Sequence, residues 1–235
     1  MDRLTRKKLK GDTFARDVGY TVEYLGEHRK QAIRYAIVGV AVLAAVLGFF
    51  YYLRQQRIAR QAALTAAKDI QEAPIGPPPG EGIKSFPTAQ ERYSAATKAF
   101  TDLAAKYSGS DEATIAQYHL GTLAAEQDKM LEAENWLKEA AQSHNANYAS
   151  LAKLTLADLY RGQGKISEAE RLLRSLIAKP TDFVSQEQAT IALAELLIPS
   201  NPNEARKLLD PLSTTSRPAV GRAAMGVLSQ LPRPQ

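Results

Sequence analysis

A recurring stripe of apolar residues limits the possible folds of this chain more than any other feature of its sequence. Each stripe has an Ala, a large apolar residue four positions later and an apolar residue three positions after that. Spacings of four and three place all members on one face of an α-helix. A fixed period of this length predicts a stack of repeated helical units. The stripe recurs every 36 or 37 residues, at Ala96, Phe100 and Leu103; Ala133, Leu137 and Ala140; Ala169, Leu173 and Leu176; and Ala205, Leu209 and Leu212.

A second set of stripes lies between the members of the first set. Turn-forming residues separate the two sets at 127–129, 162–165 and 199–202. The chain is also rich in Ala and Leu, which favour helices, and only 7% of its residues are aromatic. The sequence therefore predicts an all-α fold of helix–turn–helix units. The second stripes are Ala116, Leu120 and Leu123; Ala152, Leu156 and Leu159; and Ala189, Leu193 and Leu196.

The repeated unit resembles the tetratricopeptide repeat. Leu120-Gly121 stands where that motif has a Leu-Gly pair, and Tyr160 and Gly164 match its later positions. The second helices begin LEAE at 131–134 and SEAE at 167–170, like the acidic-Ala start of the motif. The resemblance covers 88–231 and implies a solenoid in which neighbouring units bury each other's apolar faces.

The sequence departs from the tetratricopeptide pattern at three places. Gln117 and Lys153 occupy the position of an early Trp, and the unit at 187–213 is shortened at its turn. The stripe at Ala96 has no first helix immediately before it. Residues 217–231 would form a capping helix.

An uncharged segment of 19 residues begins at Tyr35 and ends at Leu53. As a helix it would be about 28 Å long, close to the roughly 30 Å hydrocarbon core of a bilayer. Arg residues flank both ends, and Tyr35, Tyr51 and Tyr52 stand where an aromatic belt forms. A cleaved signal peptide would have a shorter apolar run and a small-residue cleavage site. We therefore predict one uncleaved transmembrane helix over 35–53.

The charges around this segment predict its orientation. Each flank of 20 residues holds four Lys and Arg, but the whole tail 1–34 is short and holds nine. We expect the tail in the cytoplasm, where it could contact anionic lipid. Its apolar residues share one helical face, typical of a short amphipathic helix, although a partly disordered tail fits the same pattern. These residues are Phe14, Val18, Val22 and Leu25.

The region after the apolar segment consists of two segments that differ in amino-acid composition. Residues 54–73 lack Pro and Gly and predict a helical stalk, whereas 74–87 hold five Pro and three Gly and predict a linker or exposed loop. In one interpretation the stalk supplies the missing first helix and 74–87 is a loop inserted in the first unit. The net charge is +4 over 1–34, +2 over 54–87 and −1 over 88–235. Because the repeat region at 88–231 is nearly neutral, nucleic-acid binding is not expected.

The sequence contains no pattern of residues typical of catalysis. With no Cys, disulfides, zinc–thiolate sites and iron–sulfur clusters are excluded, and no two of the three His have helical ligand spacing. The run Gly162-Gln163-Gly164-Lys165 lacks the earlier Gly of a phosphate-binding loop and is interpreted as a repeat turn. We predict a non-enzyme with no catalytic residue, metal, cofactor or small-molecule substrate.

The predicted activity is protein binding. First helices of such solenoids line a concave groove, and the residues facing outward on them form a mixed apolar and polar surface suited to a peptide, a helix or a partly unfolded client. The Lys/Asn/Arg clamp that some tetratricopeptide adaptors use for carboxylates is not supported, because other residue types occupy those positions. An ordinary solvated surface is the alternative. The candidate partner-binding residues are Tyr118, Thr122, Leu154, Asp158 and Arg161.

The order of the parts resembles the bacterial ancillary SecYEG translocon subunit family. That resemblance implies a single-pass protein of the bacterial inner membrane, with its repeats in the periplasm. Its implied partners are translocon subunits, client polypeptides or periplasmic chaperones. An envelope-assembly or cell-division scaffold and a complex subunit facing the cytoplasm are the alternatives.

Overall fold

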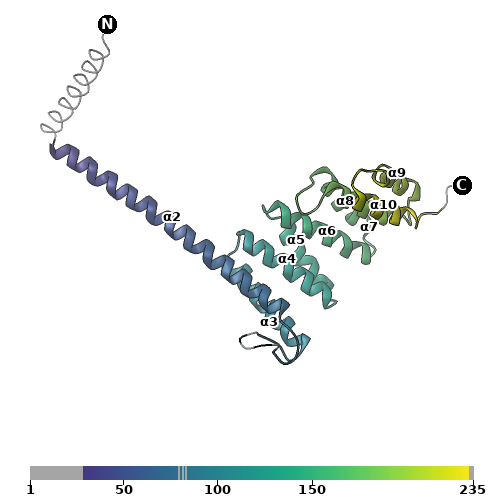
Figure 1. The fold of residues 1–235 in the computed structure, drawn as a ribbon, viewed down its shortest axis with the longest axis horizontal. Helices are drawn as coiled ribbons and strands as arrows, with labels where there is room; N and C mark the ends of the chain where they lie inside the picture. Colours follow the sequence, from purple (N-terminus) through teal and green to yellow (C-terminus); the bar gives the residue numbers. More distant parts are fainter. Residues whose placement is uncertain (1–28, 79, 81, 83, 233–235) are drawn as a thin grey trace, which may run out of the picture. The chain divides into compact units, whose positions relative to one another are not determined.

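The computed structural model describes residues 29–78, 80, 82 and 84–232. Over these residues the chain forms nine helices and no strand beyond one isolated bridge (Figure 1). The all-α fold predicted from the repeats, a solenoid behind one long apolar helix, is confirmed. The helices are α2 (Arg29–Glu72), α3 (Ala89–Lys106), α4 (Asp111–Glu126), α5 (Met130–Ala141), α6 (Ala146–Gly162), α7 (Ile166–Ala178), α8 (Gln186–Leu197), α9 (Pro202–Ser213) and α10 (Pro218–Leu228).

The first part of α2 carries the uncharged segment. It is long and apolar enough to cross a membrane, and within the described chain no part of the protein covers it. Its large apolar side chains are exposed all round the helix, from 44% at Val46 and Leu53 to 76% at Tyr35. A helix that is apolar on every face is typical of a membrane span or of a buried core helix, and among the described residues this helix is not buried. The predicted amphipathic face at Phe14, Val18, Val22 and Leu25 lies outside the described residues.

The last part of α2 belongs to the repeats. The compact unit that contains them begins at Ala59, and Ala67 is 1% exposed in a cluster with Tyr93, Phe100 and Leu120. Residues 59–72 are therefore the first helix of the first pair, with α3 as the second. This start lies upstream of the predicted boundary at 88, because the Pro-rich segment interrupts a helix pair and does not separate two domains.

The Pro-rich segment closes on itself as a loop within the first pair. Its two ends are joined where Gly76 N donates to Phe86 O at 2.9 Å and Phe86 N donates to Pro74 O at 3.0 Å. The guanidinium of Arg92 on α3 donates to Ala73 O at 3.2 Å and holds the start of the loop. Proline cannot continue the helix, so α2 ends at Glu72 and the chain turns back towards α3.

The first helices of the later pairs begin at side-chain caps. Ser110, Asn145 and Ser185 precede α4, α6 and α8, and each side chain accepts a hydrogen bond from the backbone N–H three residues on. Such a cap satisfies one of the backbone donors left free at a helix start. Short polar residues in the sequence thus define where the first helices begin.

The second helices α5 and α7 start from two equivalent tight turns. Asp128 and Gly164, 36 residues apart, both have positive φ, at 56° and 73°. The next residues, Lys129 and Lys165, each donate their backbone N–H to a carbonyl five positions earlier at 2.9 Å. The left-handed residue lets the chain reverse in two or three positions, which sets the second helix against the first.

The helix pairs stack in chain order and bury the predicted stripes (Figure 1). Phe100, Leu137 and Leu209 are fully buried, and Ala133 and Ala169 beside them are also inaccessible. Leu159 and Leu212 are only half-buried, so these two members of the stripes lie at the margin of the core.

A carboxylate also joins neighbouring pairs. Glu134 on α5 accepts hydrogen bonds from Lys138 Nζ at 2.6 Å, Lys165 Nζ at 3.0 Å and Tyr160 Oη at 3.1 Å. The bond from Lys138, with those from Lys165 and Tyr160, outweighs burial and lowers the pKa of Glu134 to about 2. Because Tyr160 and Lys165 belong to the next pair, this carboxylate holds the α6–α7 turn against α5.

Helices α4 and α5 approach each other closely at Gly121. A Cβ built on Gly121 would lie 2.6 Å from Leu137 Cγ and 3.3 Å from Leu137 N, and Leu137 is fully buried. The motif's Leu-Gly pair therefore has a packing cause, since only a residue without a side chain fits between α4 and α5 here.

We expect Gly121→Ala to destabilise the protein by about 1–3 kcal/mol, because the buried Leu137 has little room to move away. Gly162→Ala is the matched control. Gly162 ends α6, and a Cβ there would meet no atom within 4 Å. Thermal unfolding of the detergent-solubilised chain, followed by far-ultraviolet circular dichroism, measures both. Equal midpoints for the two variants would contradict the packing argument.

Candidate partner-binding face

The predicted partner-binding residues lie on two adjacent first helices, α4 and α6, which contact each other. We call the outward side of α4, α6 and α8 the first-helix face. All five residues are at least partly exposed there, and whether they bind a partner remains a prediction. They are Tyr118 and Thr122 on α4, and Leu154, Asp158 and Arg161 on α6.

Tyr118 belongs to a row of three aromatic rings. Its ring meets that of Tyr148 edge-on with centroids 5.8 Å apart, and Tyr148 meets Phe183 in the same way at 5.4 Å. The two Tyr are half-buried and Phe183 is 45% exposed. Edge-to-face contacts of this kind favour a defined arrangement of rings. The row therefore presents a fixed apolar surface that runs across three successive repeats.

Local backbone contacts hold this row in place. Asn145 caps α6 by accepting from the N–H of Tyr148 at 3.1 Å. In the loop before α8, Thr181 Oγ1 accepts from Val184 N at 3.2 Å and lies 2.7 Å from Ser150 Oγ. Because Val184 is fully buried, its neighbour Phe183 is turned outward towards Tyr148. The loop is thus anchored on one side and exposed on the other.

The sequence did not indicate this row. Tyr148 reads as a packing residue, and Phe183 lies in a loop outside every stripe. The three rings are not spaced by the repeat period, because they come from the middle of α4, the start of α6 and the loop before α8. A search for aromatic residues near the starts of successive first helices could have found Tyr148 and Phe183.

The other predicted residues have separate roles. Leu154 is half-buried against the core, and the Thr122 hydroxyl donates to His119 O at 2.9 Å within its own helix. Asp158 and Arg161 pair with each other at 3.3 Å, with their side chains 60% and 52% exposed. An exposed pair of this kind contributes little to stability, so either partner is available to exchange its contact for one on a bound protein.

His119 lies between the buried Phe100 and Tyr118 of the row. Its ring stacks on Phe100 with centroids 4.9 Å apart and meets Tyr118 edge-on at 5.8 Å. Burial, together with the nearby positive charge of Lys68, lowers the pKa of His119 to about 4. The imidazole is therefore neutral at pH 7 and acts as an aromatic packing group.

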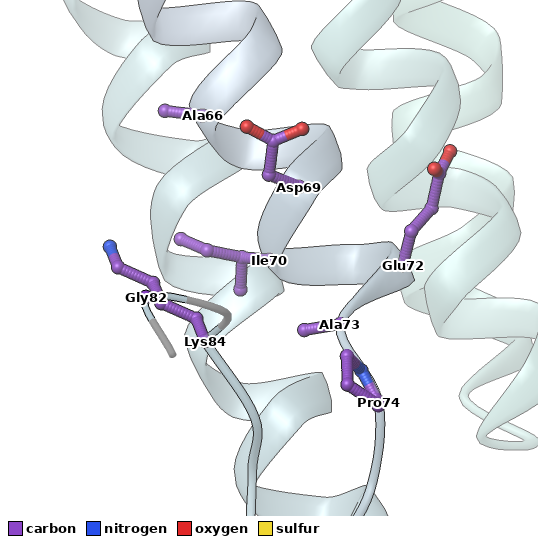
Figure 2. Close-up of a pocket in the computed structure, with 8 residues that line it drawn as sticks. All are labelled: Ala66, Asp69, Ile70, Glu72, Ala73, Pro74, Gly82 and Lys84. Carbon is purple, nitrogen blue, oxygen red and sulfur yellow. The ribbon is translucent and has the colours of Figure 1, made fainter. Parts of the chain in front are cut away.

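A separate pocket of about 410 Å³ lies between the end of α2 and the Pro-rich loop (Figure 2). Asp69, Glu72 and Lys84 supply its charges. In Figure 2 the side chain of Glu72 extends away from those of Asp69 and Lys84, so the ionisable groups do not converge on one point. Catalysis and metal binding need such convergence. Within the described residues no group of three or more potential metal ligands occurs.

The family model described as tetratricopeptide repeat-like domain matches residues 28–188, more than half of the chain. The chain belongs to the tetratricopeptide repeat-like domain family. The matched range includes α2 and the pairs α4/α5 and α6/α7. No curated protein and no solved structure matches the chain. Family membership confirms the resemblance to tetratricopeptide repeats and supports a protein–protein interaction module, while the translocon assignment remains a proposal.

We expect His119 to make this tetratricopeptide repeat-like protein less stable as the pH falls below about 6.5. An unfolded His has a pKa of 6.5, whereas the native pKa is about 4, so the unfolded chain binds the proton first. The contribution of His119 to the free energy of unfolding therefore decreases as the pH falls from 6.5 to 4. Below pH 4 this contribution no longer changes. Allowing for partial exposure, the loss at pH 5 is about 1 kcal/mol.

Two variants separate this titration from packing. His119→Phe keeps an aromatic ring and His119→Gln does not, but neither titrates. Both should show a flatter dependence of unfolding free energy on pH between 6.5 and 5 than the natural chain, as measured by urea unfolding. Identical slopes in all three proteins would show that His119 does not cause the acid sensitivity.

Proposed function

We propose that this protein is a membrane-anchored protein–protein interaction module that works as an ancillary subunit of the bacterial SecYEG translocon. The aromatic row on the first-helix face carries the proposal. Tyr118, Tyr148 and Phe183 form a partly exposed strip, and Leu154 and the Asp158–Arg161 pair lie further along α6. Rigid aromatic rings at an accessible surface are typical of sites that hold polypeptide segments.

The chemistry of this face favours a protein over a small molecule or a nucleic acid. The row crosses three repeats, and none of its three residues lines the pocket beside the Pro-rich loop. The repeat region 88–235 has a net charge of −1, which gives no attraction for phosphate backbones. We propose client polypeptides, translocon subunits or periplasmic chaperones as partners, and no catalytic activity.

The anchor and its flanks support the proposed location. The helix Ile33–Glu72 contains the apolar segment 35–53. Residues 1–34, before that segment, carry a net charge of +4. Short basic tails remain in the cytoplasm, and large domains cross regardless of charge. We therefore propose a single-pass protein of the bacterial inner membrane with residues 1–34 in the cytoplasm and the repeats in the periplasm.

The orientation is tested by reporter fusions in a bacterial host. Alkaline phosphatase fused after Gln235 should be active, because it folds only outside the cytoplasm, and green fluorescent protein at the same place should be dark. The converse pair of results would overturn the translocon proposal and would favour a complex subunit facing the cytoplasm.

Partners are tested by site-specific photocrosslinking in membranes. With a photoreactive phenylalanine at position 118 or 183, we expect adducts with translocon subunits, chaperones or exported proteins, identified by mass spectrometry. The same probe at Lys98, an exposed residue of the second helix α3, is the matched control and should give none of these adducts. Adducts confined to cell-division or envelope-assembly proteins would contradict the translocon assignment but retain the binding face.

A further inference from the structure

Two turns of the solenoid expose aliphatic side chains that are not buried in the core. Leu131 is 74% exposed, Met130 39% and Ile166 38%. Met130 and Ile166 are the first residues of α5 and α7 and stand 36 positions apart. In the described chain after Ile58, three of the six exposed large apolar residues lie at these two turns. We call residues 126–132 and 162–168 together the turn edge.

The two turns form one continuous surface. Lys165 in the second turn bonds to Glu134 on α5 at 3.0 Å, and Tyr160 at the end of α6 bonds to the same carboxylate at 3.1 Å. These contacts hold the α6–α7 turn beside the first turns of α5. Ile166 therefore lies on the same edge of the solenoid as Met130 and Leu131.

Negative charges outnumber positive ones on the turn edge, with four carboxylates against two lysines. Glu126, Asp128 and Glu168 are exposed and Glu132 is half-exposed, and among the described residues none of the four forms an ion pair. The two lysines of the turns contact the protein, and Lys129 is exposed and Lys165 half-exposed. Lys129 Nζ lies 5.0 Å from the Tyr93 ring centroid, and Lys165 Nζ bonds to Glu134 and lies 5.0 Å from the Tyr160 ring centroid.

The turn edge is distinct from the aromatic row. It lies where α4 and α6 end and α5 and α7 begin, so the dipoles of the ending and starting helices oppose each other there. The aromatic row instead lies at the middle of α4, the amino end of α6 and the loop before α8. A partner on the turn edge therefore need not displace one on the aromatic row.

We propose that the turn edge is a second docking surface, which binds a basic amphipathic segment of another protein. Aliphatic side chains of that segment would cover Met130, Leu131 and Ile166, and its Lys or Arg side chains would pair with the four carboxylates around them. Charge complementarity selects this occupant. An anionic membrane surface is disfavoured, because the same carboxylates would be repelled by it.

The test measures binding of a fluorescein-labelled 18-residue helical peptide, built from Lys and Leu with one apolar face, to the full chain. The chain is held in nanodiscs of zwitterionic phosphatidylcholine, with empty nanodiscs as a blank, and binding is read by fluorescence anisotropy. The double variant Leu131→Ser/Ile166→Ser should weaken binding about tenfold or more. Glu132→Gln/Glu168→Gln should weaken it about threefold and reduce its dependence on salt.

Matched controls keep the result specific. Met225→Ser makes the same kind of change at an exposed apolar residue of α10 and should leave the affinity unchanged. A peptide with Glu in place of every Lys should not bind. Circular dichroism of each variant should match that of the natural chain, since all the substituted side chains are at least partly exposed.

Three results would overturn the proposal. The first is that the Leu131→Ser/Ile166→Ser variant binds the Lys/Leu peptide as tightly as the natural chain does. The second is that the Glu peptide binds as tightly as the Lys/Leu peptide. The third is that Phe183→Ala alone abolishes binding, which would place the peptide on the aromatic row. If sedimentation shows that the turn edge is covered by a second copy of the chain, the proposed occupant is also wrong. None of these results bears on the crosslinks from positions 118 and 183, so the two proposals fail separately.

Discussion

The contact between a small residue on one helix and a large apolar residue on the next is the constraint on which the rest of this structure depends. Gly121 against Leu137 is one example, and Ala133 on α5 and Ala169 on α7 are further small residues that are fully buried. Neither helix of a pair can bury its apolar stripe alone, so the pairs are stable only when stacked. The stacking then determines which side chains remain outside.

Both candidate binding surfaces are consequences of that stacking. The aromatic row arises because successive first helices bring Tyr118, Tyr148 and the Phe183 loop together, although the three residues come from different units. The turn edge arises because the bond between Glu134 and Lys165 holds the α6–α7 turn against α5. In both surfaces some side chains pack or bond within the protein, and the exposed side chains beside them are available to partners.

The two parts of the long helix α2 differ in the surroundings that they suit. Its first part exposes apolar side chains all round and suits a bilayer, whereas its last part contributes Ala67 to the core of the first helix pair. The start of the repeat unit at Ala59 means that the anchor and the first repeat share one helix. The Pro-rich loop that follows completes this pair, which explains why the Ala96 stripe has no first helix directly before it in the sequence.

The sequence by itself determined the elements and their period. Residues four and three apart must share a helical face, and turn residues such as Gly164 specify where the chain reverses, so the all-α repeat fold and the apolar helix could be predicted. Short polar caps at Ser110, Asn145 and Ser185 act through neighbouring backbone groups and are equally local. These features depend on a few consecutive residues.

The tertiary structure alone decided the start of the first repeat, the partners of the predicted site residues and the two exposed surfaces. Asp158 pairs with Arg161 within one helix, but Tyr118 finds Tyr148 and Phe183 across two further repeats. Whether an apolar residue such as Leu131 is covered depends on distant helices, not on its neighbours in the sequence. Local patterns therefore predict which residues form a helix, while exposure is a property of the whole stack.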